Sequence, residues 1–264
     1  MRNNTSLKTV STLRAAAVVV AVATVAVIIA FTGCVAVNIS GSGGIAGKGQ
    51  PETFEYKVGQ YNKIKVSGFC EIQYYNGNNA AGASSDTVTL TIQPNLREHY
   101  TIEVIDNELI VSASTKIRYN STNTPVLKIY TPELNRLNID GACNFITHDR
   151  IASGSLELAI RGAGISRAEL DVESLYVDLS GAGKFELSGK ADIAVLNLSG
   201  AGELNALPLQ TRDAAVRLSG AGAIKVSCSG NLRVNANGAG SVEYRGSPSL
   251  DLNSGGLVSI RQVQ

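Results

Sequence analysis

Histidine, methionine and tryptophan are the scarcest residue types of this 264-residue chain, which has two, one and none of them respectively. Two histidines make a poor metal-ligand set, and most serines have no nearby base for nucleophilic catalysis. We therefore expect His99 and His148 to have lone surface or turn roles, and we expect no metal and no cofactor.

Basic residues are not in excess either, and this bears on the class of partner. The formal net charge is +1, and three of the 23 basic residues (Arg2, Lys8 and Arg14) lie among the first fourteen positions. The remainder has 20 basic against 22 acidic side chains, with no basic patch that stands out. This balance argues against a nucleic-acid partner, and it is also unlike that of a disordered chain.

The chain has one long apolar run, near its N-terminus. Residues 15–31, AAAVVVAVATVAVIIAF, are uncharged and follow the basic start, and Thr32, Gly33 and Cys34 come next. This order is typical of a secretory signal. Cys34 also resembles the cysteine of a bacterial lipobox, which is lipidated and becomes the first mature residue, although Phe31 stands where leucine is usual. An uncleaved membrane anchor is the alternative.

The sequence therefore predicts three parts: a signal peptide over residues 1–33, a Gly/Ser-rich tether over 34–50 and a folded domain over 51–264. We expect an extracytoplasmic lipoprotein held to the membrane through Cys34. Because no acidic cluster follows Cys34, a periplasm-facing position is favoured over the cell surface.

A Gly-Ala-Gly motif recurs along the second half of the chain. Apolar and polar residues alternate on both sides of each copy, which predicts two short strands joined by a bend. No Lys-Ser/Thr follows the glycines, so a phosphate-binding loop is disfavoured. The copies can be aligned on the residue two positions before the first glycine. These residues are Ile139, Ile160, Leu179, Leu198, Leu218, Ala236 and Leu252, with spacings of 21, 19, 19, 20, 18 and 16.

This repeat predicts an all-β fold, a single-stranded right-handed parallel β-helix (a β-solenoid) with about 19 residues per coil. Strands of neighbouring coils lie about 4.8 Å apart, so a shared corner has room only for minimal side chains. The predicted corner-forming glycines are Gly68, Gly141, Gly162, Gly164, Gly181, Gly183, Gly200, Gly202, Gly220, Gly222, Gly238 and Gly240.

An insert over about residues 76–125 follows the first predicted coil at 61–75. Three segments in it alternate like the strands of an antiparallel sheet, and Asp106–Glu108 is typical of a hairpin turn. The three segments are Thr87–Ile92, Tyr100–Ile105 and Leu109–Ala113.

Three stretches together resemble a known family. They are the opening FEYKVGQYNKIKVSGFCEIQY, the hairpin YTIEVIDNELIVSAS and the Ser-Gly-Ala-Gly ladder. Over roughly residues 52–262 the chain resembles the putative auto-transporter adhesin, head GIN domain family of bacterial envelope proteins. The resemblance implies a β-solenoid and an extracytoplasmic location, and it brings no catalytic residues.

Cys70 and Cys143 each take the place of the second corner glycine. If the first two coils are neighbours, their Cα atoms lie about 5 Å apart, within the range of a disulfide. Two interpretations stay open: a disulfide formed in an oxidising compartment, or two buried thiols that act as small apolar residues. Cys228 is expected to be buried and unpaired.

Two function hypotheses remain. The first is a non-catalytic envelope lipoprotein that presents a rigid surface for binding, adhesion or assembly. Nine of the fourteen aromatic residues fall between Phe54 and Tyr130, so a surface for a glycan or an envelope protein is expected at the insert end, where the same residues equally suit a cap. The second is a carbohydrate-active β-helix enzyme acting on envelope or dietary polysaccharide, but the outward column from Asn138 to Asp251 has no carboxylate pair.

The last repeat also predicts an open edge. After LVSIRQVQ the sequence signals no capping helix, and the ends of a solenoid expose unpaired strand edges. We expect a homo-oligomer through these ends.

Overall fold

The computed structural model describes residues 44–77, 85–119 and 124–264. The all-β class is confirmed, because these residues form strands and one short 3-10 helix, η1 (Pro94–His99). The strands are β1 (Ile45–Ala46), β2 (Glu52–Lys57), β3 (Lys63–Tyr75), β4 (Thr87–Ile92), β5 (Tyr100–Ile105), β6 (Glu108–Ala113), β7 (Ile117–Arg118), β8 (Val126–Tyr130), β9 (Arg136–Thr147), β10 (Ile151–Leu198), β11 (Glu203–Leu218), β12 (Ala223–Cys228), β13 (Asn231–Arg245) and β14 (Ser249–Gln262).

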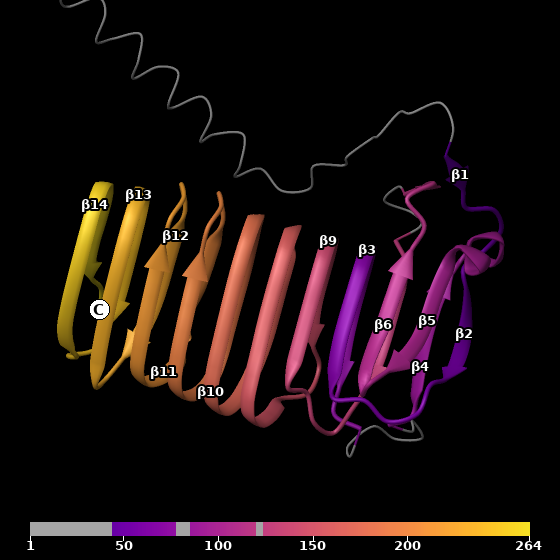
Figure 1. Cartoon of the computed structure of the whole chain (residues 1–264), viewed down its shortest axis with the longest axis horizontal. Coiled ribbons are helices and arrows are strands. Elements are labelled where there is room, and N and C mark those ends of the chain that lie inside the picture. The colour runs from indigo at the N-terminus through magenta and orange to yellow at the C-terminus, as the bar shows by residue number, and fades with distance from the viewer. Residues whose placement is uncertain (1–43, 78–84, 120–123) are drawn as a thin grey trace, which may run out of the picture. The chain divides into compact units, whose positions relative to one another are not determined.

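Twelve of these strands form one open, mixed sheet. Its order is β14-β13-β12-β11-β10-β9-β3-β8-β4-β2, with β6 also beside β3 and β5 beside β6. Figure 1 shows the strands from β14 to β3 side by side in reverse chain order. The pairs from β3 to β14 are parallel, whereas β2–β4, β4–β8 and β5–β6 are antiparallel. The sheet is therefore parallel in its C-terminal part and mixed at the insert.

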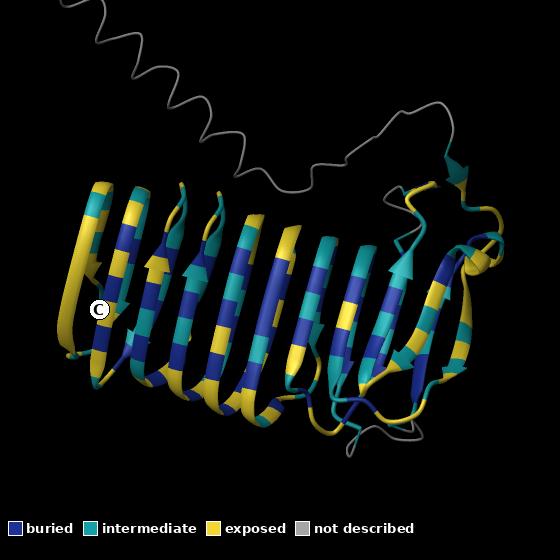
Figure 2. Ribbon diagram, viewed as in Figure 1, coloured by how far each residue is buried: buried dark blue, intermediate teal, exposed yellow. Residues whose placement is uncertain are grey.

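The parallel part repeats its register from strand to strand. Along β9 to β14, paired residues are 17 to 21 positions apart, as in Leu137 with Leu158 and Leu198 with Leu218. Because the register preserves the alternation of each copy, buried side chains lie beside buried side chains on the neighbouring strand. Figure 2 shows this as alternating buried and exposed bands.

The predicted corner glycines lie in two columns along this stack. In one column each glycine from Gly141 to Gly238 lies against the backbone of the glycine on the preceding strand; in the other, Gly164 lies against Cys143 and the next glycines follow. At Gly181 an added Cβ would lie 2.0 Å from the carbonyl oxygen of Gly162, and φ is +139°. Only glycine fits both the space and this backbone conformation.

The last corner lies two residues after the position that the sequence alignment predicts for it. The structure pairs Ser254 with Ala236, and Leu252 with Val234, so the final spacing is 18 rather than 16. The degenerate NSGG sequence hid this, since its second glycine, Gly256, lies at the corner beside Gly238.

The insert strands lie on one side of β3. β6 and β8 pair with its two halves, while β9 pairs along the other edge. Asp106 and Asn107 join β5 to β6 with φ of 51° and 61°, the left-handed conformation that a tight two-residue hairpin turn requires. The insert thus adds antiparallel strands next to the first copy of the repeat and leaves the parallel stack from β3 to β14 continuous.

Part of the predicted tether is attached to the domain. β1 pairs in parallel with β7. The backbone N–H of Lys48 donates to Asn95 Oδ1 at 2.7 Å, and Asn95 Nδ2 donates to the carbonyl oxygen of Ala46 at 2.9 Å. These contacts hold the segment before β2 against η1 and β7.

All three described cysteines are buried and unbonded. Cys70 and Cys143 are directly paired in the register of β3 and β9, and their sulfur atoms lie 3.6 Å apart. The hydrogen bond between them and burial raise the pKa of the Cys70 thiol. Cys228 is remote from this pair in the register and donates to the carbonyl oxygens of Arg212 and Asn231.

The close glycine approach gives a first test. Gly181→Ala is expected to lower the free energy of unfolding by about 2–6 kcal/mol, since it adds a backbone clash and strain at positive φ. Gly154→Ala is the control, because a Cβ at Gly154 meets nothing within 4 Å, and its effect should stay below about 1 kcal/mol. Urea denaturation followed by circular dichroism measures both, and equal effects would contradict the stacked corner.

The cysteine pair gives a second test. In an oxidising compartment the disulfide interpretation predicts a Cys70–Cys143 bond, because residues 73 apart in the chain place their thiols side by side. Non-reducing peptide mass mapping should recover one cross-linked peptide pair and a free Cys228. Reduction should lower the free energy of unfolding by about 4 kcal/mol, the value for closing a loop of this length. Recovery of all three thiols free would contradict the disulfide and leave the buried-thiol interpretation.

Candidate functional site

Three rings form a row on the outer face of the sheet where the insert meets the parallel part. Strand alternation buries Tyr74 and turns Tyr75 outward. Tyr75 lies in register with Tyr130 on β8, and His148 follows directly after β9 on the other side. The ring centroids of Tyr75 and Tyr130 are 5.2 Å apart, and those of Tyr75 and His148 are 4.7 Å apart with an interplanar angle of 3°. We call Tyr130, Tyr75 and His148 the aromatic row.

A chain of hydrogen bonds runs beside the aromatic row. The Tyr75 hydroxyl donates to Gln73 Oε1 at 3.2 Å, and Gln73 Nε2 donates to Glu71 Oε1 at 2.5 Å. All three side chains are at outward positions of β3. Burial raises the pKa of both Tyr75 and Tyr130, so both phenols are neutral hydrogen-bond donors at neutral pH.

Buried groups below the row fix β8 against β3. The Tyr74 hydroxyl donates to the carbonyl oxygen of Thr131, and the Thr131 hydroxyl lies 2.8 Å from the carbonyl oxygen of Tyr61. The Tyr61 hydroxyl in turn donates to the carbonyl oxygen of Tyr130. Because these partners are buried, the backbone that carries the aromatic row is held in one position.

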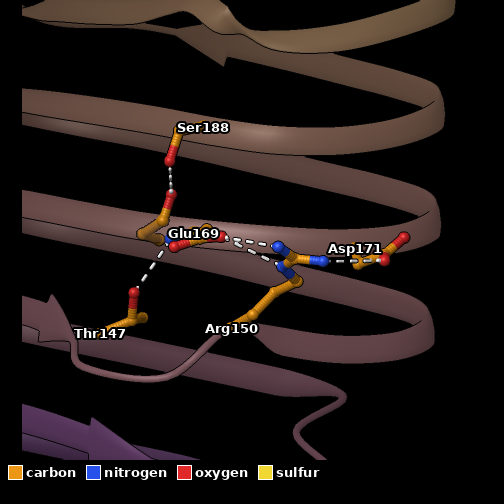
Figure 3. Close-up of polar contacts among 6 residues, drawn as sticks. Thr147, Arg150, Glu169, Asp171 and Ser188 are labelled. Atoms are coloured by element: carbon orange, nitrogen blue, oxygen red, sulfur yellow. Dashed lines mark hydrogen bonds and ion pairs between the residues drawn. The ribbon is translucent and has the colours of Figure 1, made fainter.

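A charged cluster lies next to Thr147, the residue before His148, and Figure 3 shows Arg150 between Glu169 and Asp171. The backbone N–H of Glu169 donates to the Thr147 hydroxyl at 2.9 Å. Arg150 donates to Glu169 Oε1 from two nitrogens, at 3.1 and 3.0 Å, and to Asp171 Oδ2 at 3.4 Å. All three charged side chains are slightly more than half exposed. Exposed ion pairs of this kind add little stability, so the cluster is chiefly a polar surface next to the row.

Most other aromatic residues of the insert end have packing roles. Tyr61, Tyr74 and Tyr100 are buried. The Tyr100 hydroxyl lies 2.8 Å from that of Tyr119, whose ring packs on Phe69 with centroids 4.6 Å apart. The aromatic residues that the sequence concentrates at the insert end therefore divide between buried packing roles and the outward aromatic row.

His148 was expected to have a lone surface or turn role, but its ring stacks on that of Tyr75. Cys143 and His148 are five residues apart, as are Cys70 and Tyr75, and the structure pairs Cys70 with Cys143. Alignment of the two cysteines therefore contained the signal that places His148 beside Tyr75. His99, by contrast, lies at the end of η1, and its nearest ionic contact is Glu98 at 3.7 Å.

Other candidate sites are weaker. Within the described ranges there is no cluster of three or more His, Cys, Asp or Glu side chains that could hold a metal ion. A shallow hollow of about 290 Å³ lies over β10, β11, β13 and β14. Its charged groups are already paired, Asp213 with Arg212 and Arg233 with Asp251, and hydrogen bonds from Arg212 and Asn231 lower the pKa of Asp213.

Cys34 and the apolar run over 15–31 lie outside the described residues. Within the described part, no helix is long and apolar enough to cross a membrane. The lipidation prediction therefore stays a prediction.

Several solved structures share this fold. A putative adhesin from Bacteroides fragilis is 24% identical with a TM-score of 0.76, over 83% of this chain and 100% of that one. A putative lipid binding protein from Parabacteroides distasonis is also 24% identical, with a TM-score of 0.63 over 83% and 99%. A putative adhesin from Parabacteroides merdae is 19% identical, with a TM-score of 0.64 over 84% and 100%.

No curated protein matches the sequence. The family comparison is decisive, since the match extends over residues 60–248, from the segment before β3 to the segment before β14. The chain belongs to the family described as putative auto-transporter adhesin, head GIN domain.

Proposed function

We propose that this protein is a non-catalytic cell-envelope lipoprotein that presents a rigid β-solenoid surface and binds glycans at the aromatic row. The observation that carries the proposal is the stack of Tyr130, Tyr75 and His148 beside the Glu71–Gln73–Tyr75 hydrogen-bond chain. Tyrosine offers an apolar ring together with a polar hydroxyl, which suits surfaces that contact partially polar ligands.

The rigid surface is the proposed parallel β-helix of about 19 residues per coil, single-stranded and right-handed. The parallel register with partners 17 to 21 residues apart, from β9 to β14, supports it. So does the glycine column, in which backbones approach too closely for a Cβ. In such a stack each coil is held by its two neighbours, which keeps outward side chains at fixed spacing.

The envelope location rests on two independent arguments. The family is described by the word adhesin, and two of the similar structures carry the same word. The sequence order of basic residues, apolar run and Thr32-Gly33-Cys34 is typical of a lipoprotein signal. We propose that Cys34 carries the lipid, and that the domain faces the periplasm.

A glycan fits the row better than a flat protein partner does. The groups on this face are partly exposed aromatic rings, phenol hydroxyls, an amide and carboxylates, which match the apolar faces and hydroxyl groups of sugars. Arg150 with Glu169 and Asp171 adds further hydrogen-bonding groups at the end of the row. The aromatic row could instead bind an envelope protein, and the experiment below distinguishes that partner from a glycan.

The carbohydrate-active enzyme is the second hypothesis, and one pair of carboxylates bears on it. Glu169 and Asp171 are close together, but both are about half exposed and both bind the same guanidinium of Arg150. A glycosidase needs one carboxyl group held in a buried, proton-donating environment. This arrangement supports a binding surface rather than an acid–base pair.

The aromatic row is tested on a glycan array bearing peptidoglycan fragments, capsular polysaccharides and mucin-type glycans. Tyr75→Ala should weaken binding to the strongest glycan about tenfold or more, because central aromatic contacts often contribute above 1–2 kcal/mol. Tyr176→Ala is the matched control, since Tyr176 is an exposed tyrosine on β10, and it should leave binding unchanged.

Unchanged binding by Tyr75→Ala with an intact unfolding transition would contradict the row as the site. Binding of the wild type to envelope proteins alone would replace the glycan with a protein partner. Release of shortened sugars from any array component would favour the enzyme instead.

The anchor is tested with Cys34→Ser. The variant should lose incorporation of labelled fatty acid and move from the membrane fraction to the soluble or uncleaved precursor pool, while Cys228→Ser keeps both properties. If Cys34 is lipidated, the wild type should incorporate the labelled fatty acid, and the mass of its N-terminal peptide should increase by the mass of the lipid. A wild-type protein that retains residues 1–33 without a lipid would establish the uncleaved anchor.

A further inference from the structure

The outer edge of β14 is an exposed and largely apolar part of the described domain. Among the described strands, only β13 pairs with β14. Leu250, Leu252 and Leu257 are 44%, 46% and 84% exposed, and they are three of the seven large apolar residues exposed in the described ranges. Figure 2 shows β14 exposed along nearly its whole length. A free strand edge with apolar side chains recruits another strand.

The core columns of the stack end at this strand. Leu250 and Leu252 are in register with the buried Leu232 and Val234 of β13, and Ile260 is in register with the buried Val242. These side chains therefore continue the interior columns, and within the described residues no strand beyond β14 covers them. A strand added at this edge would bury them as the earlier ones are buried.

The sequence of β14 is complementary to itself in antiparallel orientation. If Gly256 lies on a two-fold axis, Leu252 lies opposite Ile260 of the second copy and Asp251 lies opposite Arg261 of the second copy. Residues 250, 252 and 254 and residues 258, 260 and 262 all lie on the face of β14 that continues the core columns. In the antiparallel arrangement, core-facing residues of one copy therefore lie opposite core-facing residues of the other. The bend at Gly256, with φ of +74°, lies at the centre of this arrangement.

The charges next to the edge support the same register. Asp251 accepts from Arg233 at 2.7 Å, and Arg261 is paired with Glu243. Antiparallel pairing across the axis extends these pairs into a row of alternating positive and negative side chains. The row contains Arg233 and Asp251 of one copy, followed by Arg261 and Glu243 of the second copy. Opposite charges on facing strands stabilise the pairing, whereas like charges oppose it.

The opposite end of the sheet is a poorer partner for β14. β2 is short, Pro51 precedes it, and Glu52, Glu55 and Lys57 are exposed along it. The Arg97 guanidinium also lies over the Phe54 ring at 4.6 Å. Charged residues and proline are the usual protection of an edge strand, so head-to-tail growth of β14 onto β2 is disfavoured.

We propose that two copies of this protein associate through β14, edge to edge and antiparallel, with the two-fold axis at Gly256. The interface is isologous, so the same strand serves both partners. It joins two parallel stacks into one continuous sheet and covers Leu250, Leu252 and Ile260 of each copy.

The experiment is a charge-swap complementation on the full chain in mild detergent, measured by sedimentation velocity. The wild type should be a dimer. Asp251→Arg places two arginines opposite each other, and Arg261→Asp places two aspartates opposite each other, so each variant alone should dissociate at least tenfold more readily. The mixture of the two variants should recover dimers, because each arginine then faces an aspartate. Glu157→Arg, at an exposed ion pair with Arg136 elsewhere, should leave the dimer unchanged.

Circular dichroism establishes that both charge variants keep the fold. A monomeric wild type overturns the proposal, and so does a dimer that both single variants leave intact. If dimers return in the mixture, loss of the dimer in the single variants was not caused by misfolding. If both variants are folded and the mixture still contains no dimers, the antiparallel register is overturned. Open-ended growth with concentration would indicate head-to-tail pairing instead and overturn it as well.

Discussion

The close approach of parallel backbones at the glycine corners is the constraint on which the other features depend. From Gly141 to Gly240, each corner glycine lies so near the carbonyl group of the preceding strand that a methyl group would overlap it. The strands are therefore fixed in register as well as in spacing. The apolar side chains that flank each corner meet their equivalents on the neighbouring strand, and the core forms as a set of columns. The outward residues are ordered by the same register, which makes rows of like or complementary side chains possible.

The aromatic row and the β14 edge are two consequences of that order. Tyr75 and His148 are far apart in the chain, and only the pairing of β3 with β9 stacks their rings. At the other end, the same order leaves the columns open at Leu252 and Ile260. A binding surface at one end and a self-pairing edge at the other would produce a bivalent particle, in which two weak glycan contacts reinforce each other.

The sequence was informative where one short-range pattern repeats. The alternation around each Gly-Ala-Gly motif predicted the all-β class, and the insert strands Thr87–Ile92 and Tyr100–Ile105 have the predicted bounds. It was less informative where the pattern degenerates, as at Ser254, where backbone pairing with Ala236 rather than residue type decides the register. The pairing of β1 with β7 was not foreseen, because two-residue strands carry no periodicity. For the candidate site, the aromatic composition indicated the insert end, but which rings face outward depends on long-range pairing that sequence spacing alone does not reveal.

The in-register parallel stack can be measured directly as the distance between two outward positions on strands far apart in the stack. Spin labels introduced as non-natural amino acids at Asn138 and Asn235 leave the native cysteines in place. Both positions lie three residues before a corner glycine, on outward sites separated by five strand spacings. Double electron–electron resonance should give one narrow distribution centred near about 24 Å, five times the spacing between neighbouring strands. A broad distribution, or one centred beyond about 35 Å, would contradict a stack in which each copy of the repeat lies directly on the last.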